Sequence, residues 1–273
     1  MFWPFNKKAT KQIARIEIAG AIGSSTRKSV LKALQVVEER KYPALLLRID
    51  SPGGTVGDSY EIYQALQRLQ SKVKIVASYG NISASGGVYI GMGAPNIMAN
   101  PGTLTGSIGV ILRGNNLEKL LDRVGVSFKV IKSGPYKDIL SFDRQLTPPE
   151  EQILQSLIDS TYEQFVNTVA ESRHLDPATV RTFADGRIFT GEQAVEFGVV
   201  DRLGSEEDAR LWLAELADLD PQKAKLQTIE ERKPLVGRIL QSQIPGFTTV
   251  VSTADWVQFE LSTSGQPLWL YRP

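Results

Sequence analysis

The run Ala44-Leu-Leu-Leu-Arg-Ile49 constrains the fold more than any other stretch of this sequence. Its residues are almost all apolar and lack the polar alternation of a strand that faces water on one side. A continuous apolar run of strand length is typical of a parallel sheet that helices cover on both faces. The run ends in Asp50-Ser-Pro-Gly-Gly-Thr55, a glycine turn, and a helix is expected over residues 56–70. This pattern predicts an α/β fold.

The same order of strand, glycine turn and helix recurs along the chain. Strands are expected at residues 13–22, 97–101 and 126–133, and a further strand begins at Ile75. Such units are joined by right-handed crossovers and build a largely parallel sheet.

Composition changes after about Pro221, where charged and then Ser/Thr/Val-rich segments follow. We expect one catalytic domain over residues 1–221. Residues 222–273 are expected to form a tail or small appendage, which is a candidate contact with another subunit.

Composition also excludes several kinds of site. The sequence contains no cysteine, which excludes disulfides, thiolate zinc sites and a cysteine nucleophile. Its one histidine, His174, lies at the end of a charged helix and is expected to be solvated and structural, which argues against Ser-His-Asp catalysis. A net charge of +1 without a basic stripe argues against nucleic-acid binding. Any general base is therefore expected to be a carboxylate or a lysine.

Two serines, Ser83 and Ser85, lie in the turn between the strand that begins at Ile75 and a helix expected to begin near Gly86. A serine hydroxyl just before a helix lies near free N–H groups and the positive end of the helix dipole, which suits a nucleophile. The same position suits an N-cap, and serine is among the commonest caps. The residues alone leave both interpretations open.

The glycines of the earlier turn, Gly53 and Gly54, form a second candidate feature. They can adopt conformations closed to other residues and point their N–H groups outward, as a cradle for an anion or an oxyanion does. A plain turn between a strand and a helix explains them equally well.

A lysine is the base that best fits these constraints. Lys137 follows the strand expected at residues 126–133, and Ser85 follows another strand, so both are expected at one edge of a parallel sheet. Partial burial among its apolar neighbours Tyr136, Ile139 and Leu140 would favour the neutral amine. Lys129 and Lys132 are expected to be exposed.

Four segments, in this order, carry a resemblance to a known family: Asp50-Ser-Pro-Gly-Gly54, Ser83-Ala-Ser-Gly-Gly-Val-Tyr89, Leu104-Thr-Gly-Ser-Ile-Gly109 and Lys132-Ser-Gly-Pro-Tyr-Lys-Asp138. Together they resemble the short form of signal peptide peptidase A, a family of serine proteases with a ClpP/crotonase-like fold. The resemblance covers roughly residues 13–219. One difference is Val88, which stands where the family has the first aromatic residue of a Gly-Gly-Tyr-Tyr run.

The resemblance implies a role for each matching residue. Ser85 would be the nucleophile, and Ser83 a structural neighbour. Lys137 would be the general base, and Ser107 would orient that lysine.

The resemblance also implies an oxyanion hole made by backbone N–H groups. Those of Gly54 and Gly86 would be the donors, while Gly53 would shape the turn.

A homo-oligomeric ring or dome is implied as well, with its sites facing an inner cavity. Its substrates would be short, extended hydrophobic peptides such as remnant signal peptides. No cofactor and no metal are expected.

The family's usual N-terminal membrane anchor is not found, because no apolar run approaches the ~20 residues that span a bilayer. The N-terminus also lacks the features of a secretory signal. Met1-Phe-Trp-Pro-Phe5 followed by Lys7 and Lys8 would suit peripheral contact with an anionic membrane, and packing on the domain is the alternative. A cytoplasmic or peripherally membrane-associated location is expected.

Two other functions compete with a protease. An acyl-CoA hydratase or isomerase on the same fold would need paired carboxylates near the cradle, where the sequence offers Asp50, Asp58 and Glu61. A non-catalytic oligomeric scaffold would make Ser85 and Lys137 incidental.

Overall fold

The structure is a computed structural model that describes residues 11–229, 258–259, 263 and 265–271. The segment expected to contact a membrane, residues 1–8, lies outside this part of the chain. Most of the expected appendage over residues 222–273 lies outside it too.

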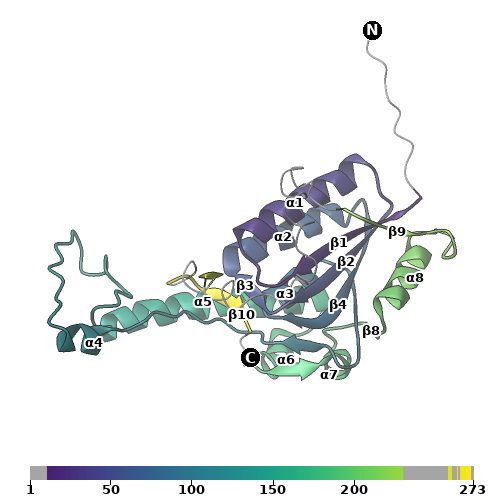
Figure 1. Cartoon of the computed structure of the whole chain (residues 1–273). Coiled ribbons are helices and arrows are strands. Elements are labelled where there is room, and N and C mark those ends of the chain that lie inside the picture. Colours follow the sequence, from purple (N-terminus) through teal and green to yellow (C-terminus); the bar gives the residue numbers. More distant parts are fainter. Residues whose placement is uncertain (1–10, 230–257, 260–262, 264, 272–273) are drawn as a thin grey trace, which may run out of the picture.

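A sheet of eight described strands forms the centre of the molecule (Figure 1). Its main path has the order β7-β6-β4-β2-β1-β9, with β5 pairing with β4 and with β8. Every pairing is parallel except that of β6 with β7. The predicted α/β fold with a largely parallel sheet is therefore confirmed. The strands are β1 (Ile13–Ala19), β2 (Ala44–Ser51), β4 (Lys74–Ala84), β5 (Asn96–Ala99), β6 (Leu104–Gly106), β7 (Ile188–Thr190), β8 (Arg202–Leu203) and β9 (Leu226–Thr228).

Helices cover both faces of the sheet (Figure 1). The core on one face includes residues of α1 (Ser24–Glu39), α2 (Val56–Leu69), α3 (Gly86–Gly91) and α5 (Pro148–Arg173). The core on the other face is closed by α8 (Glu206–Leu216). Three short helices complete the described set: α4 (Glu118–Arg123), α6 (Pro177–Arg181) and α7 (Gly191–Glu196).

Strand β2 shows why its sequence is a continuous apolar run. Leu45 and Leu47 are fully buried in the core that contains α1 and α2, whereas Ala44 and Leu46 are fully buried against the core that contains α8. Successive side chains of a strand point to opposite faces, so a sheet with two covered faces needs apolar residues at nearly every position.

The prediction of a strand at residues 126–133 is wrong. These residues follow α4 as an irregular segment with no strand pairing. Their apolar side chains are exposed, with Phe128 at 53%, Val130 at 51% and Ile131 at 92% exposure. Alternating polarity resembles a half-buried strand; here the alternating side chains have no sheet to pack on within one chain.

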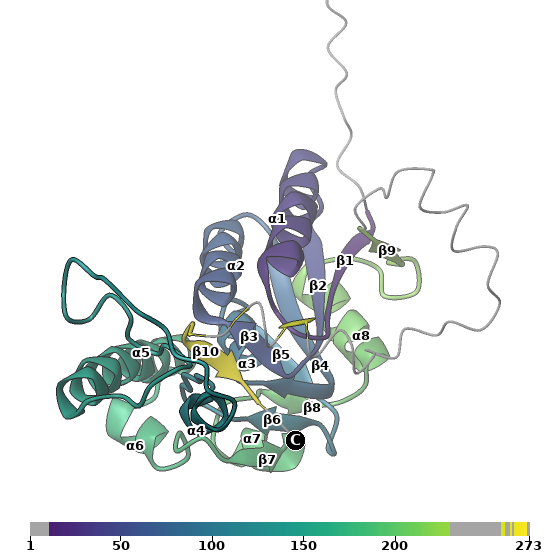
Figure 2. The same cartoon turned by 60° about the vertical axis from the view of Figure 1, so that its left-hand side comes forward.

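Two described segments beyond residue 221 pair with strands of the preceding part of the chain. Strand β9 extends the sheet beside β1. Strand β10 (Leu268–Leu270) pairs antiparallel with β3 (Gly53–Thr55), the short strand formed by the glycine turn (Figure 2). None of the described helices is long and apolar enough to cross a membrane.

Candidate active site

Ser85 occupies a strained turn between β4 and α3. Its φ of +52° and ψ of −113° are rare for a residue with a side chain. The turn is held by two backbone hydrogen bonds: the Ser85 N–H donates to the Gly106 carbonyl at 2.8 Å, and the Tyr89 N–H donates to the Ser85 carbonyl at 2.9 Å. Such strain persists only where the surroundings enforce it, and sharp turns between a strand and a helix are known positions for nucleophiles.

The Ser85 hydroxyl does not cap α3. Ser85 is the N-cap residue by position, yet its side chain makes no capping hydrogen bond. The residue is 1% exposed, and its Oγ has no hydrogen-bond partner in the described part of the chain. A buried hydroxyl without a partner is costly. The N-cap interpretation therefore fails, and no structural hydrogen bond among the described residues occupies this hydroxyl.

Gly53 and Gly54 lie directly beside Gly86. A Cβ placed on Gly53 would be 2.7 Å from the amide nitrogen of Gly86, and a Cβ placed on Gly86 would be 3.1 Å from the amide nitrogen of Gly54. The φ of Gly53 is +102°, which strains any other residue type. The structure thus brings the predicted oxyanion donors together next to Ser85.

If this turn is the oxyanion hole that the resemblance implies, Gly53→Ala should lower kcat by about 10²- to 10³-fold, the loss typical of a damaged oxyanion hole. The added Cβ cannot be accommodated without moving the Gly86 backbone. Gly57→Ala is the matched control, because a Cβ at Gly57 meets nothing within 4 Å. Steady-state kinetics of the two variants check this, and wild-type kcat in Gly53→Ala would contradict the assigned turn.

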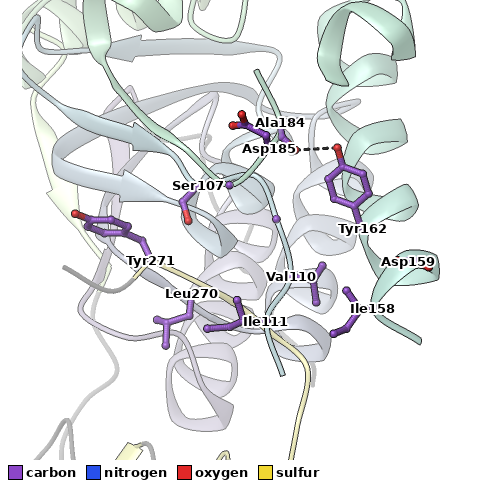
Figure 3. Close-up of a pocket in the computed structure, with 12 residues that line it drawn as sticks. Ser107, Val110, Ile111, Ile158, Asp159, Tyr162, Ala184, Asp185, Leu270 and Tyr271 are labelled. Atoms are coloured by element: carbon purple, nitrogen blue, oxygen red, sulfur yellow. Dashed lines mark hydrogen bonds between the residues drawn. The ribbon is translucent and has the colours of Figure 1, made fainter. Parts of the chain in front are cut away.

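Ser107 borders a cavity of about 530 Å³ that Leu270 and Tyr271 also line (Figure 3). It has a φ of +50°, and its N–H donates to the Arg187 carbonyl at 2.7 Å.

Two carboxylates, Asp159 and Asp185, also line the cavity. The Arg187 guanidinium lowers the pKa of Asp185 to about 2, so this side chain is ionised at neutral pH. The charge of Asp185 is balanced by its ion pair with Arg187 at 2.5 Å, and Asp159 accepts a hydrogen bond from Gln155 at 2.7 Å.

Lys137 is not brought to Ser85 within the single chain. Its side chain is exposed, so the expected burial among its apolar neighbours is wrong for one copy. The expectation that a sheet strand would place it at the edge beside Ser85 is wrong as well, because residues 126–133 form no strand. The segment between α4 and α5 projects away from the sheet (Figure 1). Lys129 and Lys132 are exposed, as predicted.

The loop that carries Lys137 is held by a chain of ion pairs. Asp138 binds Lys132 at 2.6 Å and Arg144 at 2.8 Å, and Arg144 also binds Glu150 at 2.5 Å. Hydrogen bonds from the Arg144 guanidinium, and then from Lys132, hold the pKa of Asp138 well below its usual range. Glu150 completes a capping box with Thr147 at the start of α5. Lys137 is thus presented to solvent on a tethered loop.

The carboxylates proposed for acyl-CoA chemistry have other partners. Arg27 pairs with Asp58 and with Glu61, each at 2.8 Å. Asp50 accepts the Ile82 N–H at 3.1 Å.

His174 is exposed and forms the C-cap of α5 in the left-handed conformation, in agreement with the prediction that it is solvated and structural. Among the described residues, no group of three potential metal ligands is found.

Comparison with known families decides what kind of protein this site belongs to. The sequence profile of peptidase family S49 matches residues 67–220, and that of Clp protease matches residues 7–102. The chain belongs to peptidase family S49. Its family is therefore one of proteases, and the resemblance to signal peptide peptidase A is confirmed.

Curated relatives agree with this family. Over the full length of both chains, the S49 chain is 67% identical to a Synechocystis sp. protein that carries a provisional name as a protease. It is 32% identical to the chloroplast serine protease SPPA of Arabidopsis thaliana, over 82% of this chain and 35% of the relative. Protease 4 of Salmonella typhi is 37% identical over 74% of this chain and 32% of the relative. The chain thus spans about a third of the last two relatives.

Solved structures confirm a ClpP-like fold. A mutant of the membrane-bound stomatin-specific protease 1510-N superimposes with a TM-score of 0.56 at 18% identity, over 81% of this chain and 98% of that one. A mutant of ClpP1 from Listeria monocytogenes gives 0.51 at 18% identity, over 71% and 93%.

One residue of this region was missed by the sequence reasoning. The carbonyl oxygen of Trp269 lies 2.1 Å from the place where a Cβ on Gly53 would be. The apolar run around Trp269 is visible in the sequence, but nothing local in it indicates the strand that it pairs with.

Proposed function

We propose that this S49 chain is a serine endopeptidase with a Ser-Lys dyad, in which Ser85 is the nucleophile and Lys137 the general base. The observation that supports it best is Ser85 itself. Its hydroxyl is buried in a strained turn, does not cap α3, and adjoins the glycine amides that can stabilise an oxyanion.

The chemistry follows the usual acyl-transfer sequence. Ser85 Oγ attacks the peptide carbonyl carbon while the Lys137 amine accepts the hydroxyl proton. The N–H groups of Gly54 and Gly86 stabilise the resulting oxyanion. The lysine then donates its proton to the leaving amine, and water hydrolyses the acyl-enzyme.

The dyad is proposed to form between two copies of the chain in a homo-oligomeric ring or dome. Within one copy, Lys137 is exposed on a projecting loop, whereas Ser107 borders a cavity of about 530 Å³ that a side chain of another copy could enter. The exposed side chains of Phe128, Val130 and Ile131 on the same segment supply apolar surface for the contact. Ser107 would then orient the lysine of the neighbouring copy.

The proposed substrates are short, extended hydrophobic peptides such as remnant signal peptides, and no cofactor or metal is required. Confinement of the sites inside an assembly would restrict entry to unfolded chains. No observation supports acyl-CoA chemistry, because Arg27 pairs with both of the carboxylates Asp58 and Glu61.

The pH dependence of peptide cleavage tests this proposal. An amine accepts a proton only when it is neutral, and lysine side chains in peptides titrate near ~10.4. We therefore expect kcat/KM for a hydrophobic peptide to rise steadily from neutral to alkaline pH, up to the pH at which the protein unfolds. Thermal unfolding at each pH is the control. A flat profile in folded protein would contradict a lysine base.

A further inference from the structure

Arg144 joins the loop that carries Lys137 to the start of α5. Its Nε and Nη2 atoms donate to the two carboxylate oxygens of Asp138, at 3.2 and 2.8 Å. Its Nη1 and Nη2 atoms donate to the two carboxylate oxygens of Glu150, at 2.8 and 2.5 Å. Each pair is bidentate, an arrangement that fixes geometry as well as charge. One guanidinium thus holds a residue of the loop and a residue of the helix at the same time.

The residues on both sides of Lys137 are held by side chains of the same network. The Lys132 ammonium donates to the Pro135 carbonyl at 3.0 Å and to the Asp138 carboxylate at 2.6 Å. Arg144 donates to the backbone carbonyl of Asp138 at 3.1 Å, in addition to its carboxylate. The course of the backbone through Lys137 is therefore set by two basic side chains of the segment that carries it.

The helix end of this link is firmly anchored. The Glu150 side chain is buried, and its carboxylate also accepts the Thr147 N–H at 2.8 Å and the Thr147 hydroxyl at 2.9 Å. Hydrogen bonds from Arg144, and then from the Thr147 N–H, lower the pKa of Glu150 to about 2, so the ion pair persists at neutral and alkaline pH. Farther along α5, Phe165 and Val169 are fully buried in the core. The projecting loop is thus fixed to the core through α5 (Figure 1).

We propose that Arg144 is a positioning residue, which through Asp138 and Glu150 sets the direction in which the loop presents Lys137 to a neighbouring copy. This inference rests on the proposed function for the role of Lys137. A base that must enter a site on another copy needs a loop of fixed shape, because a displacement of about 1 Å can cost ~10²-fold in rate. Arg144 supplies that shape without contacting the reacting atoms.

Arg144→Lys in the full chain separates geometry from charge. A lysine keeps the positive charge between the two carboxylates but cannot form two bidentate pairs. We expect kcat for peptide cleavage to fall about 10- to 100-fold with KM unchanged, because the general base acts in the chemical step and not in substrate binding.

Arg210→Lys is the matched control for this variant. Arg210 also forms a bidentate pair, with Glu207, and donates to two backbone carbonyls, but it lies on α8. Helix α8 closes the other face of the sheet, so Arg210→Lys should keep the wild-type kcat. Equal kcat in the two variants, in a protein whose wild type cleaves peptides and whose Lys137→Ala variant does not, would overturn the inference and leave the proposed function intact.

Mixing of variants shows which half of the dyad Arg144 serves. Ser85→Ala copies carry an intact lysine loop, so mixing them with Arg144→Lys should bring the rate to roughly a quarter of the wild-type rate after random exchange. Lys137→Ala copies supply no lysine, so mixing them with Arg144→Lys should give no increase. An increase with Lys137→Ala instead of Ser85→Ala would overturn the inference, because Arg144 would then act on the half of the site that contains Ser85.

Hydrogen exchange of the amides reads the loop without reference to catalysis. The N–H groups of Lys137, Ile139 and Ser141 all donate within the loop, and we expect them to exchange about tenfold faster in Arg144→Lys, with no change in Arg210→Lys. Faster exchange combined with full activity of Lys137→Ala would support the role of Arg144 in fixing the loop while the proposed function fails. Unchanged exchange in folded Arg144→Lys would overturn the inference.

Discussion

Lys137→Ala is expected to lower kcat for peptide cleavage by about 10⁴-fold, and mixing this variant with Ser85→Ala should restore part of the activity. Each variant keeps the group that the other lacks, and a dyad formed between copies needs only one intact group from each. After random mixing, roughly a quarter of the sites would combine Ser85 of one copy with Lys137 of its neighbour. The measurement is the rate of the mixture against that of each variant alone.

The control for this experiment is Lys129→Ala. Lys129 is also an exposed lysine of the projecting segment, so its removal should leave the rate near that of the wild type. Full activity of Lys137→Ala would contradict the assigned base. Two inactive variants that stay inactive after subunits have exchanged would contradict a dyad formed between copies.

Ser85→Ala is expected to lower kcat by about 10⁴- to 10⁶-fold, as loss of a nucleophile does in other serine proteases. Its hydroxyl makes no hydrogen bond among the described residues, so the thermal midpoint should stay near that of the wild type. Ser83→Ala is a close control, because this serine is also fully buried but lies within β4 and outside the strained turn. Ser83→Ala should keep kcat within a few-fold, and equal losses in both variants would contradict the choice of Ser85.

The parallel sheet was predictable because its signal is local. Strands such as β2 must be apolar on both faces, and each is followed by a turn whose glycines the sequence displays. The turns that carry Ser85, Gly54 and Gly86 were predictable in the same way, but the roles of these residues came from the family resemblance and not from local pattern.

The predictions that failed share one physical cause. Each depended on contacts with distant segments, which the local sequence does not specify. The alternating residues 126–133 have the pattern of a half-buried strand, yet within one chain they contact no sheet. Lys137 was expected beside Ser85 on the strength of that strand. The pairing of β10 with β3 joins residues that are more than two hundred positions apart, and local periodicity carries no information on such a pairing.

The most direct test of the central claim is to map a covalent serine-directed probe on the folded protein. The wild-type chain and Lys137→Ala are treated with a fluorophosphonate at alkaline pH, digested and analysed by mass spectrometry. The account predicts that the label is attached to Ser85, with none on Ser83 or Ser107, and that Lys137→Ala reduces the labelling rate. A label on another serine, or no label on Ser85 in the folded wild-type chain, would contradict it.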